Sequence, residues 1–330
     1  MIRAFAFLFT TLIAAVAFVG IQLKQLQATQ ISISEPTLYQ VKAGTGVNAM
    51  CRTFKANGWI NDCFWLKVYA KINPQLVELK QGMYLIESQP FLSLISKMNK
   101  GRDHQFAFTI VEGSTFKQVL ASFKDAPYLE LVSEQSLRTT LSMWGINQTN
   151  PEGWFYPDTY HYSAGDSQLD ILNRAYEKMA NTLDIAWQTR DTSVPLKSKY
   201  DALILASIIE KESGHNAERD LIASVFVNRL HKGMRLQTDP TVIYGLGDEY
   251  QGDIKKEHLK RYTDYNTYRI NGLPPTPIAM PSEQAIYATL NPRYSDFYYF
   301  VASGDGKHHF SKTLAEHNAA VRKYILKNER

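Results

Sequence analysis

Hydrophobic positions at the amino terminus predict a helix that crosses a membrane. Residues 4–23 include no charged side chain, and Arg3 and Lys24 stand at the two ends of this stretch. About 20 apolar residues are sufficient for a helix to span a bilayer. A cleaved signal peptide is the alternative, because residues 15–17 (Ala-Val-Ala) resemble a cleavage site. The apolar residues continue beyond that site, which favours an uncleaved signal-anchor over residues 1–24.

The charges beside this helix predict its orientation. Arg3 and the terminal amine favour an amino terminus on the cytoplasmic side, so the remainder of the chain faces outward. A cleaved signal peptide would also send the remainder out of the cytoplasm. Residues 25–37 are expected to form a short tether that leaves the membrane.

Residues 38–103 have the pattern of a small module with two helices between two strands. The predicted elements are a strand at 38–41, helices at 47–56 and 62–72, a strand at 82–86 and a helix at 92–98. Asn57-Gly58 ends the first helix, and Asp62 is placed to cap the second. This βααβ order resembles a LysM-type module, a carbohydrate-binding unit of cell walls. A spacer domain that lifts the rest of the chain off the membrane is the alternative.

Residues 104–330 mix strands with longer helices, so the predicted fold class is α+β with a helical core. The predicted elements are a strand at 106–111, helices from 116 and at 167–189, 200–213, 218–230 and 314–326, and a hairpin of 297–302 with 308–310. The hairpin turn is Gly304-Asp305-Gly306.

The composition is consistent with two folded domains and argues against nucleic-acid binding. The chain has 330 residues, of which 45% are hydrophobic. Its 36 basic residues are interspersed with 32 acidic ones, giving a net charge of only +4, whereas nucleic-acid binders cluster their basic residues. Cys51 and Cys63 form either a disulfide or two buried thiols, and no CxxC or His-rich spacing indicates a metal there.

Glu212 is the candidate catalytic residue that the helical spacing indicates. It continues the apolar face of residues 205–209 at i+3, i+4 and i+7 spacing. A carboxyl at the end of a buried face is desolvated, which raises its pKa and suits a general acid. Gly214 would end the helix and leave this carboxyl at the edge of a cleft. The alternatives are a structural role at the helix end and the neighbouring Glu210 as the acid.

Two later segments have the composition of sugar-binding loops. Residues 234–245 and 265–278 combine amides, hydroxyls and aromatic rings and lack a glycine pattern that would cradle phosphate. Aromatic faces stack on sugar rings, and amides and hydroxyls bond to sugar hydroxyls. Ordinary loops have a similar composition, so this feature alone leaves the two interpretations open.

Four motifs in order carry a resemblance to a known family. They are residues 206–213 (ASIIEKES), 235–241 (RLQTDPT), 265–268 (YNTY) and 272–275 (GLPP). Their order and spacing resemble the MltG (YceG-like) family of endolytic murein transglycosylases. The resemblance covers nearly the whole chain, and the first hundred residues are its least distinctive part.

The resemblance implies a lyase that uses a single carboxyl and no cofactor. Glu212, the glutamate before Ser213, would protonate the bond between N-acetylmuramic acid (MurNAc) and N-acetylglucosamine (GlcNAc). The same carboxyl would then act as the base that yields a 1,6-anhydro end. The substrate-binding residues that the motifs imply are Ser213, Gln237, Thr238, Tyr265, Asn266 and Tyr268. Asn266 would bind the N-acetyl group.

The resemblance also implies where the protein acts and with what. It places a single-pass protein in the cell inner membrane, with its catalytic domain in the periplasm. Peptidoglycan glycan strands are the expected substrate, and peptidoglycan synthases (penicillin-binding proteins) are the expected partners.

Two other functions are weighed against this one. A zinc hydrolase would use His308, His309 and His317, but no HExxH or paired-cysteine pattern supports a metal site. A non-catalytic scaffold that binds the cell wall would keep the anchor and the LysM-like module, and Glu212 would then be dispensable.

Overall fold

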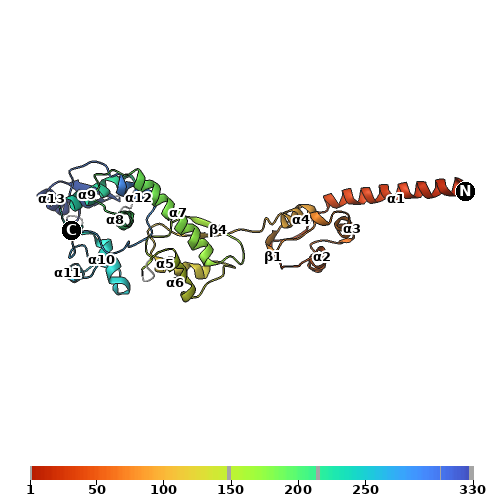
Figure 1. The fold of residues 1–330 in the computed structure, drawn as a ribbon, viewed down its shortest axis with the longest axis horizontal. Coiled ribbons are helices and arrows are strands. Elements are labelled where there is room, and N and C mark those ends of the chain that lie inside the picture. The colour runs from red at the N-terminus through yellow and green to blue at the C-terminus, as the bar shows by residue number, and fades with distance from the viewer. Residues whose placement is uncertain (1, 147–149, 213–215, 305, 327–330) are drawn as a thin grey trace. The chain divides into compact units, whose positions relative to one another are not determined.

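The computed structural model describes residues 2–146, 150–212, 216–304 and 306–326 (Figure 1). Its contacts divide the chain into two compact units. The first unit is Met1–Phe106 with His161–Asp166, and the second is Ala107–Tyr160 with Ser167–Arg330. The predicted α+β class and the apolar amino-terminal helix are both confirmed.

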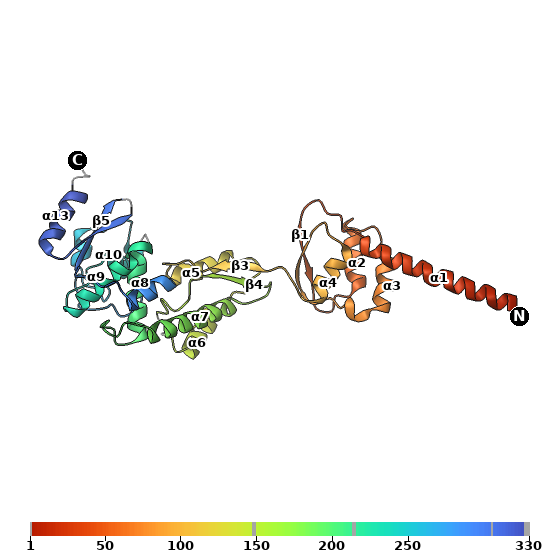
Figure 2. The ribbon, with the colours of Figure 1, turned by 90° about the horizontal axis from the view of Figure 1, so that it is seen from above.

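Helix α1 (Ile2–Ala28) projects from the rest of the first unit (Figure 2). Its segment Phe5–Ala28 is long and apolar enough to cross a membrane. The residues that were expected to form a tether differ from that prediction, because Leu26 and Ile31 are buried in the core of this unit. The Ile31 N–H also donates to the Gln89 carbonyl at 2.9 Å. Apolar side chains at these two positions draw the segment into the core.

The first unit places two helices between two antiparallel strands. Its elements are β1 (Thr37–Val41), α2 (Val47–Ala56), α3 (Phe64–Ile72), η1 (Pro74–Leu76), β2 (Gly82–Ile86) and α4 (Phe91–Asn99). In the β1–β2 pair, Tyr39 lies opposite Tyr84. The Asp62 carboxylate accepts a hydrogen bond from the Phe64 N–H at 3.0 Å, so it caps the start of α3 as the sequence suggested.

Aromatic packing and a disulfide hold this small unit together. Phe54 is fully buried, and its ring makes edge-to-face contacts with Tyr39 and Trp59, both at 5.1 Å between centroids. Cys51 and Cys63 form a disulfide with their Cα atoms 6.0 Å apart. The cross-link joins α2 to the start of α3. It stabilises a unit whose small size limits the hydrophobic surface that it can bury.

The remaining elements are mostly helices. They are β3 (Phe106–Thr109), α5 (Phe116–Ser122), η2 (Phe123–Asp125), α6 (Glu134–Met143), β4 (Thr159–Tyr162), α7 (Gln168–Gln188), α8 (Lys199–Glu212), η3 (Asn216–Glu218), α9 (Arg219–His231), α10 (Asp239–Leu246), η4 (Gly247–Glu249), α11 (Lys256–Lys260), α12 (Glu283–Leu290), β5 (Tyr299–Gly304), β6 (Lys307–Ser311) and α13 (Leu314–Tyr324). Strand β3 pairs with β4, and β5 pairs antiparallel with β6.

Helix α8 is the centre of the second unit. Helices α7, α9, α10 and α12 all contact it, and residues 202–209 are buried without exception (Figure 1). The helix is therefore covered on every side, and the single apolar face in the sequence pattern is only part of its buried surface. Polar groups at its carboxyl end need partners, because burial of an unpaired polar or charged group is costly.

Helix α10 is an element that the sequence interpretation missed. Residues 234–245 were expected to form loops, but a helix begins at Asp239. Thr238 has the extended backbone of an N-cap residue, and Pro240 lies in the first turn, where its missing N–H has no cost. Asp239 in the same turn complements the helix dipole. Together these three residues form a helix-start signal.

Candidate active site

The carboxyl of Glu212 lies at the carboxyl end of α8, where it is surrounded by protein. The Glu212 residue as a whole is partly exposed to solvent. The Oε1 atom of its carboxyl accepts a hydrogen bond from the Thr238 hydroxyl. Burial raises the pKa of this carboxyl, and the nearby Asp239 charge raises it further. The Thr238 hydrogen bond and the charges of His308 and Arg229 lower the pKa, but burial is the larger effect. Such a carboxyl can hold a proton and donate it to a bound substrate.

Thr238 is held in place by the segment that carries the YNTY motif. Its N–H donates to the Thr267 hydroxyl at 3.0 Å, and the Gln237 N–H donates to the Thr267 carbonyl at 3.2 Å. Gln237 adopts the left-handed region with φ of 49°, which is uncommon for a residue other than glycine. Residues in such conformations concentrate at functional sites. The exposed side chain of Gln237 therefore stands beside Thr238 on a constrained backbone.

Tyr268 and Asp239 form a second polar pair near Glu212. The Tyr268 hydroxyl donates to Asp239 Oδ1 at 2.7 Å. Burial, the hydrogen bond to Asp239 and the charges of Asp239 and Glu212 all raise the pKa of Tyr268. The phenol therefore stays protonated and acts as a donor. Asp239 is exposed and close enough to influence Glu212, although the sequence interpretation had not singled it out.

Arg229 supports the backbone of the segment that leads to Gln237 and Thr238. It is 7% exposed, and its Nη1 and Nε atoms donate to the carbonyls of Leu236 at 2.5 Å and Tyr298 at 2.7 Å. These bonds fix the backbone immediately before Gln237 and bring a positive charge near Glu212. The sequence signal was an arginine within the apolar stretch of α9, a position that usually requires internal partners.

Asn266 has an internal role that differs from the predicted one. Its side chain is 1% exposed, and its Nδ2 lies within 3.3 Å of three backbone carbonyls, those of His258, Leu259 and Arg261. Its Oδ1 accepts from the Tyr268 N–H at 3.0 Å. Because these contacts occupy the amide, it orders the loop and is not available to an N-acetyl group.

Tyr265 belongs to a buried network beside the site. Asn150 Nδ2 donates to the hydroxyls of Tyr265 at 3.0 Å and Tyr244 at 3.1 Å. The Tyr244 hydroxyl also donates to Glu152, which accepts the Phe116 N–H at 2.8 Å. Burial raises the pKa of Glu152 to about 7. The network joins α10 to the YNTY segment, so Tyr265 contributes to the shape of the site from within.

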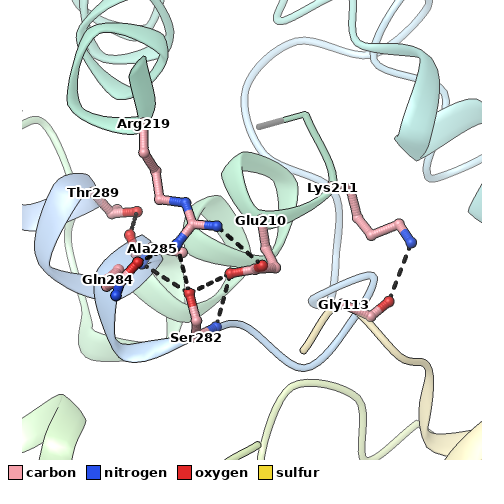
Figure 3. Close-up of polar contacts among 8 residues, drawn as sticks. All are labelled: Gly113, Glu210, Lys211, Arg219, Ser282, Gln284, Ala285 and Thr289. Carbon is pink, nitrogen blue, oxygen red and sulfur yellow. Dashed lines mark hydrogen bonds and ion pairs between the residues drawn. The ribbon is translucent and has the colours of Figure 1, made fainter. Parts of the chain in front are cut away.

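Glu210, the alternative acid, is engaged in a buried ion pair. Its Oε1 lies 3.3 Å from Arg219 Nη2, and the two side chains are 7% and 6% exposed. Its Oε2 accepts from both the N–H and the hydroxyl of Ser282 (Figure 3). Glu210 thereby ties α8 to α9 and to the start of α12.

Ser213 lies outside the described residues. Among the residues that are described, no group of three His, Cys, Asp or Glu side chains is arranged to hold a metal ion. His308 donates its backbone N–H to Glu218, and its Nδ1 lies 3.0 Å from the same carboxylate. The structure thus brings Glu212, Thr238 and Tyr268 together with Asp239 and Arg229.

Comparison with known proteins identifies related chains. The model of the YceG-like family matches residues 39–323. A protein from Bacillus subtilis (strain 168) named endolytic murein transglycosylase is 32% identical, over 88% of this chain and 85% of its own length. A protein of the same name from Streptococcus pneumoniae (strain R6) is 25% identical, over 96% of this chain and 64% of its own length. A crystal structure of a yceG-like protein from Listeria monocytogenes matches with a TM-score of 0.57 and 30% identity, covering 86% of this chain and 99% of that one.

Proposed function

The chain belongs to the YceG-like family, and we propose that it is a lytic transglycosylase that cleaves peptidoglycan glycan strands with Glu212 as its acid–base group. The names of its relatives support the activity. The observation that supports the residue is the buried Glu212 carboxyl, with its raised pKa, at the partly exposed end of α8. Glu210, the rival carboxyl, is occupied by Arg219 and Ser282.

The proposed reaction is an intramolecular transfer that consumes no water. Protonated Glu212 gives its proton to the glycosidic oxygen between MurNAc and GlcNAc, and the bond from that oxygen to the MurNAc C1 breaks. The C6 hydroxyl of the same MurNAc attacks C1, and the Glu212 carboxylate takes the hydroxyl proton. The products are a 1,6-anhydro MurNAc end and a free GlcNAc hydroxyl, and Glu212 is again protonated.

The neighbouring residues position this carboxyl and line the groove. The Thr238 hydroxyl holds Glu212 Oε1 and stabilises the carboxylate that forms after proton donation. Gln237 and Tyr268 flank Thr238 and are proposed to contact the sugars, together with Ser213. Tyr265 shapes the groove through its network with Asn150. Asn266 is proposed only to order the loop.

The chemistry of the new strand ends tests this proposal. Purified peptidoglycan treated with the protein should yield glycan fragments with 1,6-anhydro ends, detected by mass spectrometry. Reducing ends would instead indicate hydrolysis, for which Asp239 beside Glu212 would be the second carboxylate. Intact strands would favour the non-catalytic scaffold.

The pH dependence of cleavage should report the charge of Asp239. The Asp239 carboxylate raises the pKa of Glu212, so the Asp239→Asn variant should have a lower Glu212 pKa. The acid must be protonated to act, so activity falls as pH rises through that pKa. We therefore expect the alkaline limb of the rate profile to move to lower pH in the variant. Asp253→Asn, an exposed aspartate outside this cluster, should leave the limb in place. An unmoved limb in Asp239→Asn would refute the electrostatic role.

The first unit and α1 are proposed to hold the enzyme at its substrate. The β1–α2–α3–β2 order with an antiparallel strand pair supports a LysM-like module that binds glycan strands. Helix α1 supports a single-pass inner-membrane anchor with a periplasmic body, where peptidoglycan synthases would be partners. A reporter that folds only outside the cytoplasm, fused after residue 37, should be active; an inactive reporter would reverse the orientation.

A further inference from the structure

A large cavity within the second unit is lined in part by Lys211, the residue that precedes Glu212. Its volume is about 880 Å³, and residues of α5, α8 and α10 line it. Lys211 on α8 and Pro240 on α10 are among the lining residues. Lys211 directly precedes Glu212, and Pro240 directly follows Asp239. Neither Glu212 nor Asp239 is among the described residues that line the cavity, so the cavity contacts the two segments that carry them through Lys211 and Pro240. Because successive helical residues are rotated by about 100°, Lys211 and Glu212 face different sides of α8.

Most charges around this cavity are already paired within the protein. The Lys117 ammonium lies 2.6 Å from Asp248 Oδ1 across the rim. Glu152, which also lines the cavity, accepts hydrogen bonds from the Phe116 N–H and the Tyr244 hydroxyl. These contacts hold the walls in place and leave neither carboxylate as a free partner for a ligand.

Lys211 is different, because no acidic side chain among the described residues forms an ion pair with it. Its Nζ donates to the Gly113 carbonyl at 3.2 Å, which directs the side chain away from Glu210 (Figure 3). Lys211 and Gln118 also line an adjacent cavity of about 430 Å³ that includes Glu112. Among the described residues, the ammonium has this one backbone acceptor. It lines both cavities and has further donors for an anionic ligand.

Peptidoglycan supplies such an anion close to the cleaved bond. Each MurNAc carries a short peptide on its lactyl group, and this peptide has free carboxylates. A cavity of several hundred Å³ is of the size that binds small ligands, and a lysine pairs with a carboxylate by a charge-assisted hydrogen bond. Tyr244 and Tyr250 add aromatic surface to its walls.

We propose that this cavity binds the peptide branch of the MurNAc at the cleavage site, with Lys211 pairing with a carboxylate of that peptide. The inference rests on the proposed function, since it assumes that a glycan strand lies along Glu212. This pairing of Lys211 with a peptide carboxylate makes the protein selective for strands that still carry peptides with free carboxylates.

Two forms of one substrate test the proposal. Purified strands carrying intact peptides are compared with the same strands after their peptide carboxylates have been converted to amides, and new anhydro ends are counted over time. The wild-type protein should cleave the carboxylate form about tenfold faster, the scale of one charge-assisted contact. Lys211→Met should cleave both forms at the rate of the amidated one. Lys211→Arg, which keeps the charge, and Lys124→Met, an exposed lysine outside the cavity, should retain the preference.

Each other outcome has a distinct meaning. Equal wild-type rates on the two forms would overturn the peptide site while leaving the transglycosylase activity intact. Equal losses on both forms in Lys211→Met would overturn it as well, since Lys211 would then act on Glu212 itself. No cleavage of either form by the wild-type protein would refute the proposed function on which the inference rests.

Discussion

Glu212→Gln should lower the rate of strand cleavage by roughly 10³-fold, within the range that a general acid–base group contributes. The glutamine amide cannot donate the proton that the departing sugar oxygen needs. Its carbonyl oxygen can still accept the Thr238 hydrogen bond, so the surrounding loop should keep its geometry. The measurement is the release of anhydro-ended fragments from purified peptidoglycan, with circular dichroism to verify the fold.

A matched control separates the loss of this proton from a general effect of neutralising a glutamate. Glu257→Gln changes an exposed residue of α11 and should leave the rate within experimental error. Activity of Glu212→Gln within about tenfold of wild type would be too small an effect for the loss of the only acid. The acid would then have to be sought at Asp239, the other carboxylate of the cluster.

Arg219→Met should cause the largest loss of stability among single substitutions near the site. Arg219 and Glu210 form a buried ion pair, and Arg219 Nη1 also donates to the Ser282 hydroxyl at 3.0 Å. The variant leaves Glu210 buried without its counter-charge, which costs about 3–5 kcal/mol in the free energy of unfolding. Urea denaturation followed by tryptophan fluorescence measures this loss.

Two further variants sharpen the stability experiment. Arg138→Met removes an exposed pair with Glu134, which should change stability by less than about 1 kcal/mol. Adding Glu210→Gln to Arg219→Met should recover part of the loss, because the uncompensated charge is then gone. A loss below about 1 kcal/mol for Arg219→Met would show that water reaches Glu210, and Glu210 would again be a rival for the catalytic role.

Local sequence patterns were sufficient to predict most of the helices and strands. Helix α2, the strand β2 and the helices α7 and α8 lie within about two residues of their predicted bounds, the usual uncertainty of helix ends. Their periodicity and their Gly and Pro stops are properties of neighbouring residues. The patterns did not predict α6, β4, α11 and α12, nor α10, whose start signal at residues 238–240 lies within a predicted loop.

Only those residues of the site that stand in a local sequence pattern or motif could be predicted. The apolar spacing on α8 singled out Glu212, and the motifs added Gln237, Thr238 and Tyr268. The role of Asn266 could not be derived, because its amide contacts carbonyls whose positions depend on the path of the loop. The same holds for Asp239, which approaches Glu212 only after α10 packs against α8.

The sequence by itself therefore determined the apolar amino-terminal helix, the α+β class and the helix that carries Glu212. Each of these follows from side chains that are close in the chain, where periodicity and caps act. Only the tertiary structure decided that Glu210 pairs with Arg219, that Cys51 bonds to Cys63 and that Lys211 faces a cavity. The pKa and the partners of a group depend on burial and on charges from distant segments, and these exist only once the segments have packed together.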